Sequence, residues 1–483
     1  MSYIVFLAAV VGVYYIMPLF MRKVLLLAAS FAFYAVWNAK YLLLMWAVIG
    51  TSWLCGLVIS KWPGYKKRAA SAALFAVFGL LVVFKYLNFL ISSVNRAFGT
   101  GLGALDIILP VGISFYIFQA AGYVIDVYRD PSAREKNIIN YRLFISFFPQ
   151  LVAGPIERSK NMLGQLKTKQ AFSLENIKHG ATLILIGLVQ KVVIADRLAV
   201  FVTNAFDNYR QAGSLSLLTA AFFFAFQIYC DFNAYSMIAQ GSARLMGYRL
   251  MTNFNRPYLS QSVAQFWRRW HISLSSWFSD YLYIPLGGSR KGRGRTYINL
   301  LIVFLVSGLW HGAAYTFVIW GLINAFYNMT ERFFRENKAS KSGEKAGDKT
   351  SRGVKHAGSG ILKAVFTFIL IDFSWIFFRA ESLGRAAGYI KCIFTNFGPA
   401  ELSMVSLAFN KGDLILSFLL IFILLVCQIY LEKRHKNTPL EQVVDGWKIP
   451  VQAFVYAALF LALVVIGEYG VNYVENPFIY FQF

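Results

Sequence analysis

Long apolar runs separated by short polar loops make up most of this chain of 483 residues. A helix needs about 20 predominantly apolar residues to cross the hydrocarbon core of a bilayer. The runs that reach or approach this length are 2–20, 24–37, 41–60, 69–93, 105–125, 181–198, 215–238, 297–310, 314–333, 361–378, 414–431 and 451–470. The pattern predicts an all-α polytopic membrane protein with about 11 or 12 transmembrane helices, in which all 483 residues form a single membrane-embedded domain.

Three other segments break this pattern. Residues 144–158 are apolar but short and contain Pro149 and Pro155, which favours a re-entrant segment over a full crossing. Residues 249–296 mix basic and aromatic side chains, as helices at the headgroup level do. Residues 335–358 are rich in Lys, Gly and Ser, which is typical of a flexible loop.

Composition and charge agree with a membrane protein. Apolar residues are 58% of the chain and charged residues 14%, a balance that excludes a water-soluble globule. The net charge of +24 does not indicate nucleic-acid binding, because the basic residues cluster in short loops between apolar runs. By the positive-inside rule these loops, and with them 249–296 and 335–358, face the cytoplasm. The loop 379–413 is assigned to the outer side although it carries four basic residues. The four scattered cysteines predict neither a metal site nor a disulfide framework.

Candidate chemistry centres on two histidines in apolar, aromatic surroundings. His311 lies in a stretch without charged side chains between Asn299 and Glu331, and His271 lies about forty residues earlier. Each is either a core histidine bonded to the backbone or a proton-handling group within the membrane. Fourteen residues, about 21 Å of helix, precede His311 in the span 297–310, which predicts that His311 lies inside the bilayer.

Charged residues also occur inside apolar runs. Lys191, Asp196 and Asp231 form either interhelical ion pairs or part of a polar pathway. If they relay protons together with the histidines, the protein is a proton-coupled transporter or flippase. That alternative favours repeated halves, which the sequence does not display.

Five sequence blocks, in order, resemble the membrane-bound O-acyltransferase family, in its bacterial branch whose members acylate alginate and teichoic acids. The blocks are LPVGISFYIFQAAGYVIDVYR (109–129), FFPQLVAGPIER (147–158), DFNAYSMIAQGSARLMGY (231–248), NFNRPYLSQSVAQFWRRWHISLSSWFSDYLYIPLGG (253–288) and GLWHGAAYTFVIWG (308–321). The resemblance implies helices around a central tunnel, in which an acyl group passes from a thioester to a hydroxyl.

The resemblance also implies roles for particular residues. His311 matches the histidine of the GLWHG block and is expected to be the catalytic base, which suits neutral imidazole with its unperturbed pKa near 6.5. His271 matches the WRRWH histidine and is expected either to donate a hydrogen bond to the thioester carbonyl or to hold the acceptor hydroxyl. Further residues of the same blocks are expected to bind substrate: Asp231, Asn233, Tyr235, Asn255, Trp267, Arg269, Trp270 and Trp310. Several positions depart from the family pattern, which affects acceptor choice rather than the chemistry: Asn233, Ala234, Met237, Gln265 and Ser279.

We therefore expect an O-acetyltransferase of the bacterial cytoplasmic membrane, surrounded by membrane lipid. Acetyl-CoA or an acyl carrier thioester is the expected donor substrate, entering from the cytoplasm, and no bound cofactor or metal is expected. The expected acceptor is a hydroxyl of a cell-envelope or exported polysaccharide, reached directly or through an extracytoplasmic transferase partner. D-alanyl transfer to teichoic acid is the alternative within the same chemistry.

Overall fold

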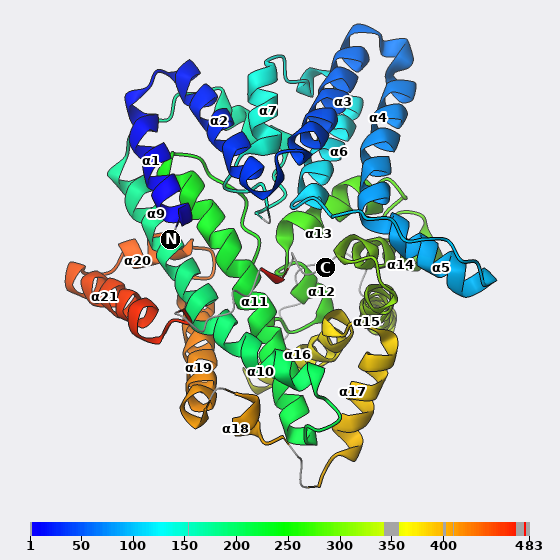
Figure 1. Ribbon diagram of the computed structural model, residues 1–483, viewed down its shortest axis with the longest axis vertical. Coiled ribbons are helices and arrows are strands. Elements are labelled where there is room, and N and C mark those ends of the chain that lie inside the picture. The colour runs from blue at the N-terminus through cyan, green and yellow to red at the C-terminus, as the bar shows by residue number, and fades with distance from the viewer. Residues whose placement is uncertain are drawn as a thin grey trace. The chain divides into compact units, whose positions relative to one another are not determined.

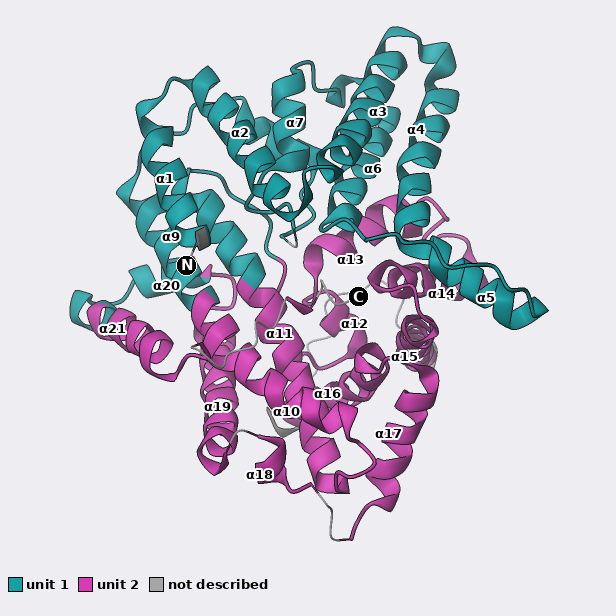
Figure 2. Ribbon diagram, in the orientation of Figure 1, with its two compact units in different colours: residues 1–187, 235–252, 440–452 teal, residues 188–234, 253–439, 453–483 magenta. Residues whose placement is uncertain are grey.

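The computed structural model describes residues 2–152, 154–341, 357–398, 402–408, 410–469 and 478–479. These residues form helices and connecting loops, with a single β-bridge between Ala212 and Leu402 as their only strand-like pairing. The fold class is all-α, as the apolar runs predict (Figure 1). By internal contacts the chain divides into two compact units (Figure 2). Unit 1 comprises residues 1–187, 235–252 and 440–452, and unit 2 comprises residues 188–234, 253–439 and 453–483.

Unit 1 contains the N-terminal helices. They are α1 (Ser2–Ile16), α2 (Leu19–Asn38), α3 (Tyr41–Lys61), η1 (Pro63–Tyr65), α4 (Lys66–Leu81), η2 (Val82–Tyr86), α5 (Leu87–Phe98), α6 (Ile113–Arg129), η3 (Pro131–Ala133), α7 (Ile138–Ser146), α8 (Ser159–Leu166), nearly all of α9 (Leu174–Leu188) and α20 (Leu440–Asp445). Its core packs α3, α4 and α6 against one another. The long helix α11 (Ser214–Leu245) contributes its last part, from Tyr235 onward, to this unit.

Unit 2 contains the remaining helices and both candidate histidines. They are η4 (Val189–Ala195), α10 (Asp196–Asp207), the first part of α11, η5 (Pro257–Leu259), α12 (Val263–Trp267), α13 (Ile272–Phe278), η6 (Ser279–Tyr283), α14 (Gly292–His311), α15 (Tyr315–Lys341), α16 (Ala357–Arg379), α17 (Leu383–Thr395), α18 (Met404–Leu407), α19 (Lys411–Arg434) and most of α21 (Ile449–Ile466). The segments η2, η4 and η6 are π-helical, so their turns are wider than those of an α-helix.

Seven helices in the described part of the chain are long and apolar enough to cross a membrane. They lie at Leu19–Asn38, Tyr41–Lys61, Pro63–Phe98, Ser214–Leu245, Gly360–Arg379, Lys411–Arg434 and Ile449–Ile466. The other predicted spans also fall on helices, which are shorter or less apolar. The protein is therefore a multi-pass membrane protein of helices.

Some predicted boundaries differ from the observed ones. The run 105–125 becomes helical only at Ile113. The span expected at 297–310 starts earlier, at Gly292, and α14 has 20 residues ending at His311. Such a helix is about 30 Å long, so the argument that a short helix places His311 inside the bilayer does not hold. In the expected loop 335–358, α15 continues to Lys341, and residues 342–356 lie outside the described ones.

The segment expected to be re-entrant leaves the helical conformation at Phe147, after α7. Residues 147–152 and 154–158 form turns and irregular backbone, and nearly all of them are buried. The backbone amide of Phe148 finds a partner in the hydroxyl of Ser30, at 3.1 Å. Irregular backbone without such partners would be costly at membrane depth.

Helices α14 and α15 approach each other closely through glycine, which brings His311 to its position in unit 2. A Cβ atom added to Gly308 would lie 2.3 Å from the carbonyl oxygen of Phe317, and one added to Gly321 would lie 2.5 Å from that of Phe304. Only the absence of a side chain permits this contact, as in small-residue helix interfaces within membranes.

Candidate active site

His311 is the last residue of α14, and its imidazole is buried among aromatic rings. It is 5% exposed. Its ring centroid lies 4.9 Å from that of Trp310, 5.1 Å from Trp320 of α15 and 5.2 Å from Phe378 of α16. Three helices of unit 2 therefore enclose this side chain.

His271 stands at the start of α13 and is also buried, at 1% exposure. Its backbone adopts φ of 44°, in the left-handed region that residues other than glycine rarely occupy. Such strain persists where the surroundings hold a residue in place, and it is common at functional sites. The imidazole contacts Phe232 of α11 at 4.7 Å and Trp310 at 5.7 Å between ring centroids. Because Trp310 contacts both imidazoles, the two histidines share one aromatic cluster.

The hydrogen bonds around Asn253 determine the tautomer of His271. The Oδ1 atom of Asn253 accepts from the backbone amide of Ser273 at 3.3 Å and from its hydroxyl at 2.7 Å. An atom that accepts from a backbone N–H is the amide oxygen, which fixes the orientation of the Asn253 side chain. His271 Nδ1 lies 3.3 Å from the same oxygen, so Nδ1 carries the proton and donates. The neutral ring then has its lone pair on Nε2, and burial lowers the pKa of His271 to about 3.

Three further tryptophans complete the aromatic cluster. Trp320 lies 5.8 Å from Trp375 of α16, nearly parallel to it, and 5.5 Å from Trp267 of α12. Trp270 packs 5.0 Å from Trp375. The indole Nε1 atoms of Trp267 and Trp320 have no hydrogen-bond partner within the described residues, whereas the Trp375 indole is hydrogen-bonded to the Tyr258 hydroxyl. A buried indole N–H usually has a partner, so the Trp267 and Trp320 donors require an explanation.

The predicted substrate residues Asp231 and Asn233 belong to a polar network beside this cluster. Lys191 Nζ lies 2.8 Å from Asp196 Oδ1 and 2.7 Å from Asp231 Oδ1. Asp231 Oδ2 also accepts from the backbone amide of Ile479 at 2.7 Å, and Asn233 donates to Gln190 at 2.8 Å. The charged residues inside apolar runs are therefore ion-paired, which was one of the two interpretations of their presence.

The π-helical geometry of η4 makes the first of these pairs possible. Lys191 and Asp196 are five residues apart, and the Asp196 amide donates to the Lys191 carbonyl. Residues five apart lie about 140° apart around an α-helix but on the same face of a π-helix.

Two other predicted residues lie in an ion-paired patch of unit 2. Arg269 Nη2 lies 2.8 Å from Glu432 Oε1, and Arg256 Nε lies 3.3 Å from Glu432 Oε2. The Asn255 side chain is exposed and accepts from Arg256 Nε at 3.0 Å. Arg269 is thus engaged by Glu432, and Asn255 and Arg268 are exposed. Tyr235 lies on the part of α11 that belongs to unit 1 and is half-buried.

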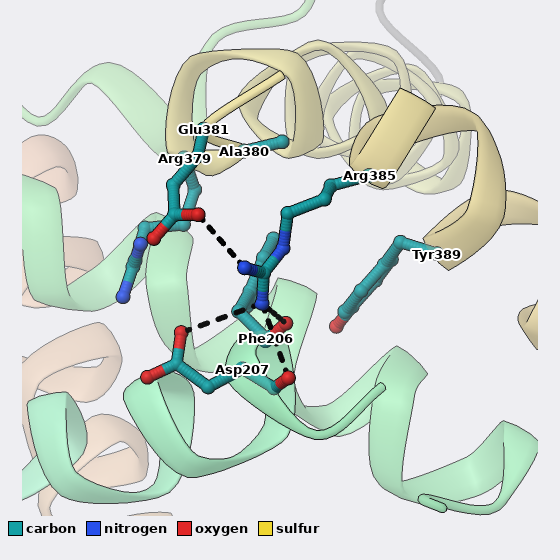
Figure 3. A pocket seen from close by; sticks show the side chains of 7 residues that line it. All are labelled: Phe206, Asp207, Arg379, Ala380, Glu381, Arg385 and Tyr389. Carbon is teal, nitrogen blue, oxygen red and sulfur yellow. Dashed lines mark hydrogen bonds and ion pairs between the residues drawn. The ribbon is translucent and has the colours of Figure 1, made fainter. Parts of the chain in front are cut away.

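A small polar pocket follows Phe378 at the end of α16 (Figure 3). Its lining comprises Phe206, Asp207, Arg379, Ala380, Glu381, Arg385 and Tyr389. Arg385 Nη1 donates to Glu381 at 2.8 Å, and Nη2 donates to the carbonyl of Asp207 at 3.1 Å. These acidic partners offset part of the positive charge of the loop 379–413, which is expected on the outer side. The pocket lining contains no histidine, serine or cysteine, and its carboxylate Glu381 is engaged by Arg385, so we assign no chemistry to it.

Within the described residues, no group of three or more His, Cys, Asp or Glu side chains gathers as a metal site would. The four cysteines are unpaired thiols.

Sequence reasoning missed several residues of the cluster, namely Phe232, Asn253, Trp320, Trp375 and Phe378. The first three lie inside the resemblance blocks, where their neighbours were chosen instead. The other two lie in the apolar helix α16, in a run that shows no polar residue except Asp372 and Ser374 near them. Only the packing of α16 against the histidine cluster reveals them.

Comparison with known proteins identifies relatives along the whole chain. MBOAT, the membrane-bound O-acyltransferase family, matches residues 31–341. The chain is 36% identical over 498 aligned residues to a probable alginate O-acetylase of Pseudomonas putida, covering 99% of this chain and 98% of the relative. It is 36% identical to a peptidoglycan O-acetyltransferase of Helicobacter pylori over 402 residues, which cover 77% of this chain and 74% of the relative. A teichoic acid D-alanyltransferase of Bacillus subtilis is 27% identical over 287 residues, covering 57% of this chain and 70% of the relative.

The multi-pass helical fold and these matches define a membrane-embedded acyltransferase. The chain belongs to the membrane-bound O-acyltransferase family, which confirms the resemblance stated from the sequence. It is therefore an enzyme, and membership favours acyl transfer over the transporter alternative.

Proposed function

We propose that this protein is an O-acetyltransferase of the bacterial cytoplasmic membrane. It moves an acetyl group from a cytoplasmic thioester to a hydroxyl of a cell-envelope or exported polysaccharide. The observation that carries the proposal is the pair of buried imidazoles, His271 and His311, that contact the same Trp310 ring in a chain of this family. The names of the Pseudomonas and Helicobacter relatives support acetyl as the acyl group and a polysaccharide as the acceptor.

In the proposed reaction the acceptor hydroxyl attacks the carbonyl carbon of the thioester. The neutral imidazole of His311 takes the hydroxyl proton as the new C–O bond forms, which overcomes the weak nucleophilicity of an alcohol at neutral pH. The C–S bond then breaks, and the departing thiolate takes the proton from the His311 imidazolium. The products are an ester and a thiol, and both the base and the proton count are restored.

The tautomer of His271 favours one of the two roles expected for it. A neutral ring with its proton on Nδ1 and its lone pair on Nε2 accepts a hydrogen bond at Nε2 and cannot donate one there. We therefore assign His271 to holding the acceptor hydroxyl rather than to stabilising the thioester carbonyl. Its low pKa keeps it neutral at physiological pH, so this role does not depend on its protonation.

The donor is proposed to bind on the cytoplasmic side, where acetyl-CoA and acyl carriers occur. The basic side chains Arg268, Arg290, Lys291, Arg293 and Arg295 are exposed and suit the phosphates of such a donor. Membrane headgroups present the same phosphate chemistry. The KM for the donor distinguishes the two sources. If these basic residues bind the donor, restoring them one at a time to a protein that lacks them should lower the KM for acetyl-CoA. If they bind only headgroups, the KM should not change.

The acceptor is proposed to reach the site from the outer side, directly or through an extracytoplasmic transferase partner. D-alanyl transfer remains the second candidate, supported by the match to the Bacillus relative, which is less similar and covers less of the chain. The identity of the donor separates the two: acetyl-CoA should be consumed and a D-alanyl carrier should not.

The test uses membranes that contain the full chain and radiolabelled acetyl-CoA, with thiol release and labelled ester as readouts. His311→Ala should abolish transfer, because a general base contributes about 10²–10⁴-fold to the rate. His435→Ala is the matched control, since His435 lies at the end of α19 against Tyr430. If His311→Ala retains about a tenth of the activity, His311 is not the base.

The sidedness is tested by cysteine labelling. Ser289 is exposed in the turn before α14 and belongs to the segment proposed to face the cytoplasm. A single cysteine there, in a chain whose four native cysteines are replaced, should react with an impermeant reagent only in opened cells. Labelling in intact cells would invert the orientation and exclude a cytoplasmic donor at this face.

A further inference from the structure

Acyl transfer from a thioester needs a hydrogen-bond donor for the carbonyl oxygen, because negative charge develops on this atom in the transition state. His271 does not provide it, since the neutral ring donates through Nδ1 to Asn253. The donor must therefore be another N–H or O–H group near His311. One indole group that contacts the His311 ring, that of Trp320, has no hydrogen-bond partner within the described residues.

We propose that the indole Nε1–H of Trp320 is this donor, so that Trp320 is a catalytic residue that binds the carbonyl oxygen of the acetyl thioester. The proposal rests on the proposed function, because it assumes that His311 is the base of an acyl transfer. It adds a residue for which the sequence predicted no role.

Packing holds the Trp320 ring in a defined orientation. The side chain is fully buried, at 0% exposure. Its ring lies edge-on to His311 at 5.1 Å and contacts Phe378 at 5.4 Å. Trp375 stacks on it at 5.8 Å, and Trp267 meets it edge-on at 5.5 Å. A donor fixed in this way pays no reorganisation cost when charge appears, which is the property that an oxyanion site requires.

The burial of the N–H gives the second argument. Leaving a buried donor without a partner costs about 1–3 kcal/mol, so a fold retains one where it is used. The other two indoles fit the role less well. The Trp375 indole already has the Tyr258 hydroxyl as a hydrogen-bond partner, and Trp267 is only half-buried.

The acceptor oxygen bonds to the carbonyl carbon while its proton passes to His311, and the π electrons of the C=O bond move onto the oxygen. The Trp320 N–H donates to this oxyanion without losing its proton. When the C=O bond re-forms, the C–S bond breaks, and the thiolate leaves with the proton held by His311.

The experiment removes the N–H and keeps the ring. Trp320→Phe, in the full chain in membranes with acetyl-CoA as the probe, should lower kcat about 100-fold or more, the effect of deleting one oxyanion donor. The KM for acetyl-CoA should change less than about threefold, because the bond strengthens mainly in the transition state. The matched control is Trp375→Phe, which removes a neighbouring buried indole N–H and should change kcat by only a few fold.

A second variant separates catalysis from packing. Trp320→3-benzothienylalanine replaces the N–H by sulfur at nearly constant shape and should be as slow as Trp320→Phe. If this isostere works at the rate of the unmodified protein, or if Trp375→Phe is equally slow, the proposal is wrong. The result for His311→Ala distinguishes a failure of the proposed function from a failure of the role proposed for Trp320. An active His311→Ala protein refutes the proposed function itself, whereas an inactive one with an active Trp320 isostere refutes only the role of Trp320.

Discussion

Replacing Asn253 by Asp tests the assigned state of His271 directly. Asn253 is 1% exposed, and its Oδ1 accepts from His271 Nδ1 and from both the amide and the hydroxyl of Ser273. A carboxylate of the same shape can accept from all three donors. The substitution therefore keeps the tautomer of His271 and adds a negative charge beside its ring.

The size of the effect follows from the distance. Two unit charges about 4 Å apart interact by about 4 kcal/mol at an effective dielectric constant of 20. An attraction of this size favours the imidazolium, so the pKa of His271, lowered to about 3 by burial, should rise strongly in Asn253→Asp. Where the ring becomes an imidazolium, Nε2 has no lone pair with which to hold a hydroxyl.

The assay is the pH dependence of kcat between pH 5 and pH 8 in membranes with acetyl-CoA. Asn253→Asp should be active at pH 8 and lose activity as the pH falls toward 5, by up to about tenfold per pH unit. The unmodified protein should have no such loss from His271. Asn253→Ala, which removes the acceptor without adding charge, should be slower at every pH and less stable by about 1–3 kcal/mol. An Asn253→Asp profile that matches the unmodified protein would refute the assigned role of Nε2.

Three further predictions concern stability, measured by thermal unfolding in detergent. Lys191→Met leaves Asp196 and Asp231 buried without their partner and should destabilise the protein by about 3–5 kcal/mol. Adding Asp231→Asn should recover part of this loss. A single variant as stable as the unmodified protein would contradict the ion-pair network. Gly308→Val should separate α14 from α15 and prevent folding or lower activity strongly, because the added Cβ would lie 2.3 Å from a carbonyl oxygen. An unchanged melting temperature would show that the two helices are not in this contact. Burial raises the pKa of Glu157 to about 7 in the folded protein. The folded state therefore favours the protonated carboxyl, and this contribution to the free energy of unfolding is fully present below the pKa of Glu157 in the unfolded chain and is lost as the pH rises through 7. Glu157→Gln should flatten this decline between pH 5 and pH 8, and an unchanged slope would assign the decline to other groups.

The apolar runs were sufficient to predict the fold class, because membrane helices are recognisable from the length and composition of their apolar runs. The two histidines were identifiable for a related reason: an imidazole is conspicuous where almost every neighbour is apolar. Residues such as Trp267 and Trp310 could be chosen because they adjoin those histidines in the chain.

The remainder of the site depends on contacts between distant segments. Trp320 and Phe378 meet His311 through the packing of α15 and α16, and no periodicity in either helix marks them. Arg269 illustrates the opposite error. It adjoins the histidine block in sequence, yet its guanidinium is engaged by Glu432, more than 160 residues away. Adjacency in the chain was used where adjacency in space was needed.

The π-helical turn at η4 has a consequence for how this chain can change length. The wide turn holds one residue more than an ordinary α-helical turn. Removing one residue between Lys191 and Asp196 would leave the two residues four apart, which in an ordinary α-helix also places them on one face. Such a deletion should therefore keep the ion pair and the orientation of α10, whereas a deletion within α10 itself would rotate the residues after it by about 100°. In relatives that share this ion pair, η4 is the place where a one-residue alignment gap inside a helix is expected.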